Sequence, residues 1–132
     1  MVSYRTPLGQ ARGLGSAKHG AGHWLSERVS SIALVPLSLW GVCSALRLSK
    51  MGYQGSADWL HSPFNAVLGV LLVAVSFQHM HAGLRVVVED YIHTALARSA
   101  LLLLNLAVCV LGGSLAVFCI LKVALGVAAI PA

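Results

Sequence analysis

Long apolar stretches alternate with short polar segments along the chain. Three stretches, residues 29–48, 65–88 and 99–121, each approach the ~20 residues that cross about 30 Å of hydrocarbon as a helix. The polar segment between the first two contains Gly, Asp and Pro together with Tyr53 and Trp59, and it predicts an outer loop whose aromatic side chains rest at the membrane interface. The pattern predicts an all-α fold of three transmembrane helices.

The connections predict how these helices are arranged. Residues 92–98 form a short inner connection, and short connections make successive helices antiparallel, so we expect an up-down-up bundle. Basic residues are distributed unevenly between its two ends. One end has Arg5, Arg12, Lys18, Arg28, Arg85 and Arg98, and the other end has Arg47, Lys50 and Lys122. By the positive-inside rule, the N-terminus is cytoplasmic and the C-terminus is periplasmic.

The first 25 residues differ from the rest of the chain. They have no long apolar run and do not resemble a secretory signal peptide, so they predict a cytoplasmic N-terminal arm (residues 1–25) that lies on a soluble partner or on anionic headgroups. A three-helix transmembrane domain (residues 26–132) follows. Ser26 is a candidate N-cap of the first helix, with Glu27 in its first turn, and Pro36 is expected to bend that helix.

Composition supports a location in the bilayer. With 58% hydrophobic residues, 10% charged residues and a mean hydropathy of +0.81, the chain is too apolar for a soluble domain of its size. The net charge of +5 is scattered along the chain and lacks the clustered pattern of a nucleic-acid surface, so no nucleic-acid partner is expected.

The small size of the bundle predicts that it works with partner chains. Three helices are too few to enclose a cofactor or a transport path unaided, and no hydrophilic segment is long enough for a flavin or iron-sulfur domain. Three cysteines fall in the apolar stretches, with the spacing of neither a zinc nor an iron-sulfur site, and we expect them to pack as small hydrophobes: Cys43, Cys109 and Cys119.

Two histidines fall inside the second apolar stretch. An ionisable residue at this depth is unfavourable in lipid, so His79 should face the bundle interior, a partner or a cofactor. Two readings stay open, a metal ligand or a neutral imidazole hydrogen-bonded to another helix. His81 lies about 200° around the helix from His79, so the two cannot chelate one metal, and we expect His81 to make a polar contact between helices. Asn105 predicts a helix-helix contact in the third stretch.

Further residues share the face of His79 on the second helix. Eleven residues of helix return a side chain to the same face about 16 Å further along, which aligns Asp90 with His79. Gly83 lies on this face and leaves a bare patch where a flat group could approach. Asp90 and Tyr91 fall at the membrane edge, where interfacial capping is the alternative role. This arrangement suits a haem ligand below a quinone site.

Two roles are open for Arg28, at the inner end of the first helix. It could anchor the helix at headgroup depth, or it could pair with haem propionates, because a planar guanidinium suits carboxylates. His23 and Ser31 are nearby candidates for the same cluster.

Two stretches of the sequence resemble a known family. The stretch from His79 to Tyr91, with Gly83 four residues after the histidine and Asp90-Tyr91 at the helix end, resembles the second helix of the small membrane-anchor subunit of succinate dehydrogenase, respiratory complex II. Residues 22–37 resemble the N-terminal part of its alphaproteobacterial members. The resemblance covers roughly residues 20–98, and the third stretch is similar only in its length and apolarity.

The resemblance implies a role for each matching residue. His79 would be an axial ligand of haem b, with the other axial histidine supplied by a larger cytochrome b anchor subunit. Tyr91 would hydrogen-bond a ubiquinone carbonyl, Asp90 would be the adjacent acid of the quinone site, and Arg28 would lie near the haem propionates.

The function implied is that of a non-catalytic anchor in the bacterial inner membrane, which is favoured over the mitochondrial one. With the larger anchor it would attach a flavoprotein subunit and an iron-sulfur subunit, so that electrons from succinate reach ubiquinone. One alternative is a fumarate reductase anchor that uses menaquinone. Another is a non-redox structural or accessory membrane protein, in which His79 and Asp90 only link helices.

Overall fold

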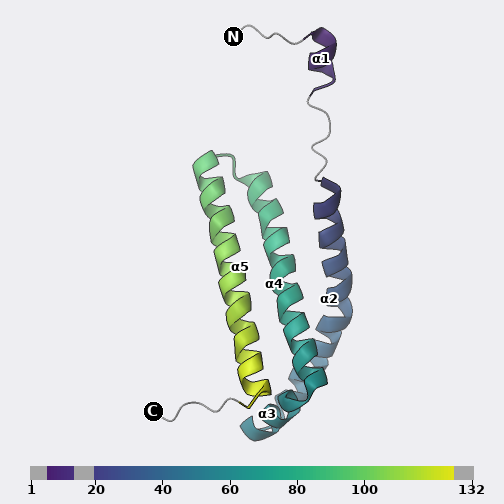
Figure 1. Cartoon of the computed structure of the whole chain (residues 1–132), viewed down its shortest axis with the longest axis vertical. Coiled ribbons are helices and arrows are strands. Elements are labelled where there is room, and N and C mark those ends of the chain that lie inside the picture. The colour runs from purple at the N-terminus through teal and green to yellow at the C-terminus, as the bar shows by residue number, and fades with distance from the viewer. Residues whose placement is uncertain (1–5, 14–19, 127–132) are drawn as a thin grey trace.

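The described part of the chain is helical throughout. The computed structural model describes residues 6–13 and 20–126. Its helices are α1 (Pro7–Ala11), α2 (Gly20–Leu48), α3 (Tyr53–His61), α4 (Pro63–Tyr91) and α5 (Ala95–Ala124) (Figure 1). Of these, α2, α4 and α5 are long and apolar enough to cross a membrane. The predicted all-α fold with three transmembrane helices is confirmed.

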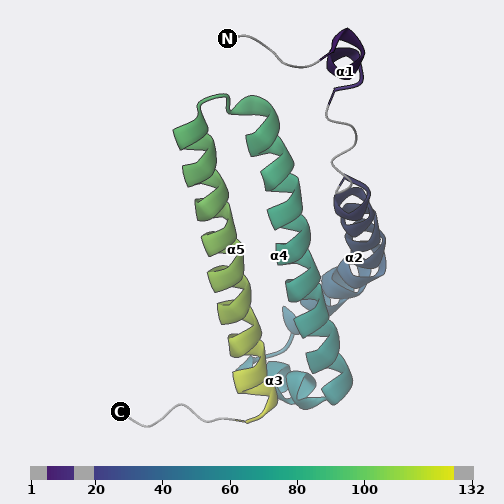
Figure 2. The ribbon, with the colours of Figure 1, turned by 45° about the horizontal axis from the view of Figure 1, so that its top comes forward.

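Helix α4 is the centre of the bundle. It packs against α2 on one side and α5 on the other, and both views show the three long helices in that order (Figures 1 and 2). Successive long helices run in opposite directions, as predicted from the short connections. Which membrane side each end faces remains a prediction from the basic residues.

The first long helix begins earlier than the sequence predicted. Helix α2 starts at Gly20, so Ser26 lies inside it, and the predicted N-cap is wrong. Contacts between residues four apart support these early turns. The guanidinium of Arg28 lies 5.6 Å from the centre of the Trp24 ring, and Nδ1 of His23 lies 3.8 Å from Oε1 of Glu27.

The predicted outer loop contains a helix of its own. Helix α3 contacts α4 and α5 at their ends. Its Trp59 ring stacks on Trp40 of α2 at 5.8 Å between centroids, and its backbone carbonyl accepts a 2.8 Å hydrogen bond from Asn65 Nδ2. Nδ1 of His61 lies 3.2 Å from the carbonyl oxygen of Ala124. These contacts tie the segment to all three long helices.

Glycines allow the long helices to approach closely. A Cβ at Gly41 of α2 would lie 2.7 Å from Leu72 of α4, closer than atoms can pack. A Cβ at Gly112 of α5 would lie 2.9 Å from the Phe77 ring of α4. Small residues at such contacts are typical of helices packed within a bilayer, where close van der Waals packing drives association.

Burial is the reverse of that in a soluble protein. The buried side chains are small or polar, namely Ser30, Ser44, Ala66, Asn105 and Cys109, and no large side chain is fully buried in the described part. Large apolar side chains such as Leu39, Leu103 and Leu111 are 66%, 67% and 70% exposed. This surface suits contact with lipid or with other membrane chains, because soluble proteins rarely expose so large an apolar surface to water.

Candidate functional site

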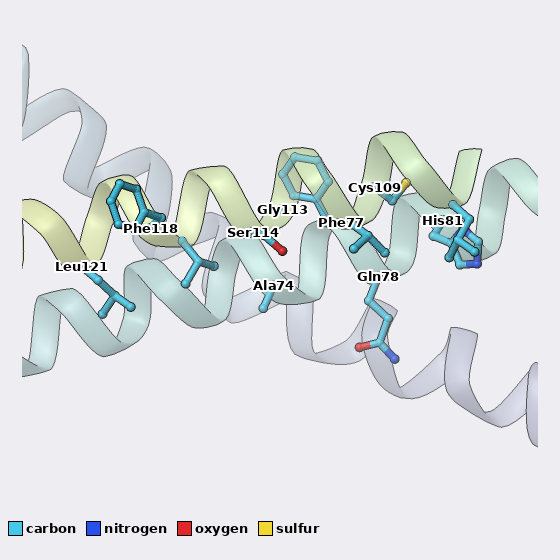
Figure 3. Close-up of a pocket in the computed structure, with 12 residues that line it drawn as sticks. Ala74, Phe77, Gln78, His81, Cys109, Gly113, Ser114, Phe118 and Leu121 are labelled. Carbon is cyan, nitrogen blue, oxygen red and sulfur yellow. The ribbon is translucent and has the colours of Figure 1, made fainter. Parts of the chain in front are cut away.

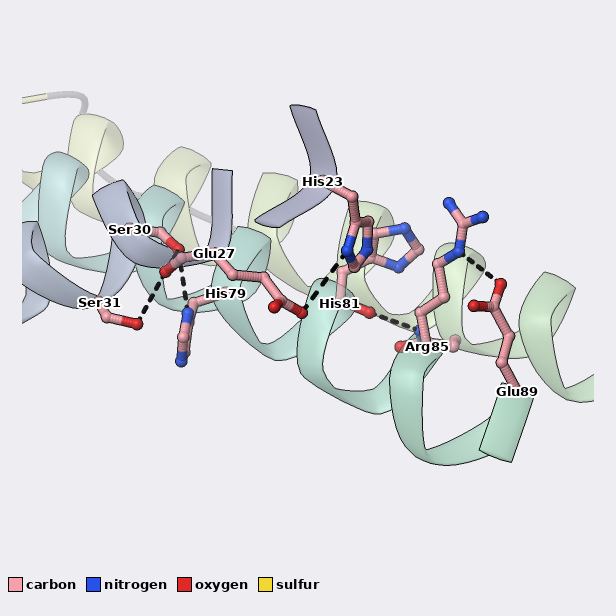
Figure 4. Close-up of polar contacts among 9 residues, drawn as sticks. His23, Glu27, Ser30, Ser31, His79, His81, Arg85 and Glu89 are labelled. Carbon is pink, nitrogen blue, oxygen red and sulfur yellow. Dashed lines mark hydrogen bonds and ion pairs between the residues drawn. The ribbon is translucent and has the colours of Figure 1, made fainter. Parts of the chain in front are cut away.

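The mid-span histidine of α4 contacts α2. Nδ1 of His79 lies 3.0 Å from Oγ of Ser30, and the imidazole is partly buried (Figure 4). Ser30 is only 6% exposed. The Ser30 hydroxyl also donates to the backbone carbonyl of Glu27 at 3.0 Å, one turn earlier in α2. His79 therefore makes the hydrogen bond to another helix that was one of its two predicted roles, and Ser30 is a partner that was not predicted.

One face of α2 carries the polar residues near this contact. His23, Glu27 and Ser30 recur at the four- and three-residue spacing of a helix face. Ser31 lies about 100° away, and its hydroxyl donates to the same Glu27 carbonyl at 2.7 Å. The recurrence of His23, Glu27 and Ser30 on one helix face was the available signal for Ser30.

The second histidine of α4 faces α5. The backbone carbonyl of His81 accepts a 3.0 Å hydrogen bond from Asn105 Nδ2, and Cys109 Sγ donates to Asn105 Oδ1 at 3.3 Å. The predicted helix-helix role of Asn105 is confirmed. The polar contact expected of the His81 imidazole is instead made by its backbone, because Nδ1 of His81 is buried and has no hydrogen-bond partner among the described residues.

An apolar groove lies over the α4–α5 pair. It has a volume of about 570 Å³ and is lined by residues that include Phe77, His81, Cys109, Gly113 and Phe118 (Figure 3). His79 does not line it. The two histidines thus belong to different sides of α4, in agreement with their predicted angular separation.

The remaining predicted residues of α4 are exposed. No atom lies within 4 Å of the position that a Cβ would take at Gly83, apart from its own helix backbone and neighbours. Asp90 and Tyr91 end the helix, with Tyr91 77% exposed. Because α4 is continuous from Pro63 to Tyr91, Gly83 and Asp90 keep the helical spacing from which their shared face with His79 was predicted.

The charged residues where α2 begins and α4 ends contact side chains of their own helices. Arg28 is exposed and stacks on Trp24, about 200° around α2 from Ser30, so its side chain points away from the His79 contact. Its role beside haem propionates remains a prediction. Nε of Arg85 pairs with Oε1 of Glu89 at 2.8 Å on an exposed face of α4. Such exposed pairs contribute little to stability.

The described side chains do not form a complete metal site. Residues 6–13 and 20–126 contain no group of three or more His, Cys, Asp or Glu side chains that could hold a metal ion. His79 is a single imidazole with one nitrogen hydrogen-bonded, and Gly83, one turn further along α4, is uncovered. A haem held here would need a second axial ligand from another chain.

The fold and these contacts define a class of protein, a small three-helix membrane protein with a few polar contacts between its helices and with apolar faces left for lipid or other chains. The chain belongs to the family of the succinate dehydrogenase/fumarate reductase transmembrane subunit, whose model matches residues 2–126. The match extends through α5, beyond the part covered by the motif resemblance.

Curated relatives agree with this membership. The succinate dehydrogenase hydrophobic membrane anchor subunit of Rickettsia conorii is 32% identical over 111 residues, 83% of this chain and 88% of that protein. Its counterpart from Rickettsia bellii is 35% identical over 101 residues, covering 76% and 80%. The protein of the same name from Paracoccus denitrificans is 32% identical over 104 residues, covering 76% and 78%. No solved structure matches the chain. The predicted family resemblance is confirmed.

Proposed function

We propose that this chain is the non-catalytic small anchor of a succinate:ubiquinone oxidoreductase in a bacterial inner membrane, and that it contributes one haem b ligand and part of the quinone site. The main support is the position of His79, held at mid-span by Ser30 on a helix that continues to Asp90 and Tyr91. The curated relatives named here favour succinate dehydrogenase over a menaquinone-linked fumarate reductase anchor.

His79 is the proposed axial ligand. When bound, haem b supplies one-electron redox chemistry, with a potential set by its axial ligands and their hydrogen bonds. The chain provides the imidazole, the hydrogen bond to Nδ1 and the uncovered surface at Gly83. Arg28 is the proposed partner of the propionates, a role that requires its guanidinium to leave Trp24 when the complex assembles.

Asp90 and Tyr91 are the proposed quinone residues. Reduction of a quinone takes two electrons and two protons, so its site needs a donor at a carbonyl oxygen and access for protons. The exposed Tyr91 phenol can donate that hydrogen bond. Asp90, which is also exposed at the helix end, is suited to orient water or a neighbouring cation.

The proposed partners are a larger cytochrome b anchor, an iron-sulfur subunit and a flavoprotein. The exposed apolar side chains of α2 and α5 leave surface for the larger anchor within the bilayer. The end that carries Arg28, Arg85 and Asp90 is the proposed docking side for the soluble subunits.

Deletion of this chain from its host tests the anchoring role. The succinate-to-dye activity of the soluble subunits should move from the membrane fraction to the soluble fraction, and succinate-to-quinone activity should disappear. Expression of the wild-type chain should reverse both changes. Membrane-bound, quinone-linked succinate oxidation in the deletion strain would refute the proposal.

A further inference from the structure

Ser30 makes two polar contacts through one hydroxyl. Its Oγ lies 3.0 Å from Nδ1 of His79 on α4 and 3.0 Å from the carbonyl oxygen of Glu27 on its own helix. The residue is 6% exposed, so water cannot readily take the place of either partner. The directions of the two hydrogen bonds therefore depend on each other.

A count of protons fixes both directions. A serine hydroxyl has one proton and two lone pairs, and a carbonyl oxygen can only accept. If the proton pointed to His79, two lone-pair oxygens, those of Ser30 and Glu27, would face each other at 3.0 Å without a hydrogen between them. Donation to Glu27 avoids this, and His79 Nδ1 must then carry the hydrogen that Ser30 accepts.

The tautomer of His79 follows from these directions. A neutral imidazole carries its proton on only one of its two nitrogens. With Nδ1 protonated and bonded to Ser30, Nε2 has a free lone pair, and it is the nitrogen that can ligate a metal. We propose that Ser30 is a positioning residue that holds His79 in the Nδ1–H tautomer and presents Nε2 to the haem iron. This inference rests on the proposed ligand role of His79.

The same hydrogen bond tunes the ligand. An acceptor on Nδ1–H increases the electron donation of Nε2 and fixes the ring plane, and loss of such a partner commonly lowers metal affinity roughly 10–100-fold. Ser30 and His79 lie on different helices, so the ring orientation depends on the packing of α2 against α4. A serine that merely linked two helices would hold them together without altering the electronic properties of a haem.

Three variants of Ser30 separate these roles in the purified complex. Ser30→Ala removes the acceptor, Ser30→Cys replaces it with a weak one of similar size, and Ser30→Thr keeps the hydroxyl. Ser44→Ala is the matched control, because Ser44 is also buried on α2, 7% exposed, and lies about 21 Å further along the helix than Ser30. The measurements are the haem-to-flavin ratio, the haem affinity and the midpoint potential, with succinate-to-dye activity in membranes as the check of assembly.

We expect Ser30→Ala to weaken haem affinity by roughly 10–100-fold and to raise the midpoint potential, because a less basic ligand stabilises ferric iron less well. Ser30→Cys should change the haem affinity and the midpoint potential in the same directions, but by smaller amounts. This variant keeps the test informative if the alanine variant fails to assemble. Ser30→Thr and Ser44→Ala should resemble the wild type.

Two results would overturn the inference: wild-type haem affinity and midpoint potential in both Ser30→Ala and Ser30→Cys, or equal shifts in Ser44→Ala. Failure of the proposed ligand role of His79 gives a different result, because the His79→Ala complex would keep its low-spin haem. If His79→Ala loses that haem and the Ser30 variants leave haem affinity and potential unchanged, only the Ser30 inference fails.

Discussion

Tyr91 is exposed at the position where the proposed quinone would bind. The residue is 77% exposed at the end of α4, beyond the apolar part of the helix. His79, in contrast, is partly buried and hydrogen-bonded. The spacing along one helix was enough to predict that Asp90 shares the face of His79. The Ser30 contact was not predicted, because it joins residues 49 apart and depends on how α2 packs against α4.

Tyr91→Phe should reduce succinate-to-quinone activity while succinate-to-dye activity persists. The lost hydrogen bond is worth ~0.5–1.5 kcal/mol, so quinone binding should weaken up to about tenfold, and a misplaced quinone would slow turnover further. Tyr53→Phe is the control, since Tyr53 is 84% exposed but lies on α3 at the other end of the bundle. Full quinone activity in Tyr91→Phe would remove Tyr91 from the mechanism.

Arg28→Ala should shift the haem midpoint potential or weaken haem retention, because it removes a cation from a region of low dielectric. Arg28→Lys should recover only part of the effect, since an ammonium cannot reproduce the guanidinium fork. Arg47→Ala, at the opposite end of α2, is the matched control. If redox titration gives one potential for all four proteins, Arg28 is an anchor that stacks on Trp24 and has no haem role.

Element boundaries follow from more than apolar runs. Helix α4 ends at Tyr91, where the sequence placed the helix end, and so continues past the apolar stretch that ends at residue 88. Arg85 pairs with Glu89 in its last turns. Helix α3 was not predicted, because it has only nine residues and they are mixed in polarity. Contacts such as the Trp40–Trp59 stack hold it in place. The three spans could be predicted from the length of their apolar stretches, whereas the formation of α3 depends on contacts with neighbouring helices.

Replacement of a glycine by leucine should have different effects on α4 and on α5. Gly83→Leu should leave assembly intact, since no atom lies within 4 Å of its Cβ position, but should lower haem content by blocking the bare patch. Gly112→Leu should instead reduce the amount of assembled complex, because its Cβ would lie 2.9 Å from Phe77. Pigment content per flavin and the yield of complex measure the two effects. Normal haem content in Gly83→Leu would mean that Gly83 has no haem role.

The whole molecule is an open three-helix layer with polar contacts between its helices and large apolar side chains on its outside. It presents His79 at one seam of α4 and the groove with His81 at the other. Composition and length predicted that the protein lies in a bilayer and that it works with partner chains. The different surroundings of the two histidines appeared only in the packed bundle, where each faces a different helix.

The central claim is that His79, and not His81, ligates haem in the assembled complex. A reduced-minus-oxidised visible spectrum of complexes carrying His79→Ala or His81→Ala tests it most directly, with succinate-to-dye activity in membranes to establish assembly. His79→Ala should lose the low-spin b-type spectrum, because removal of one axial ligand leaves haem five-coordinate or unbound. His81→Ala should keep that spectrum. An unaltered low-spin spectrum in assembled His79→Ala complex would contradict the account.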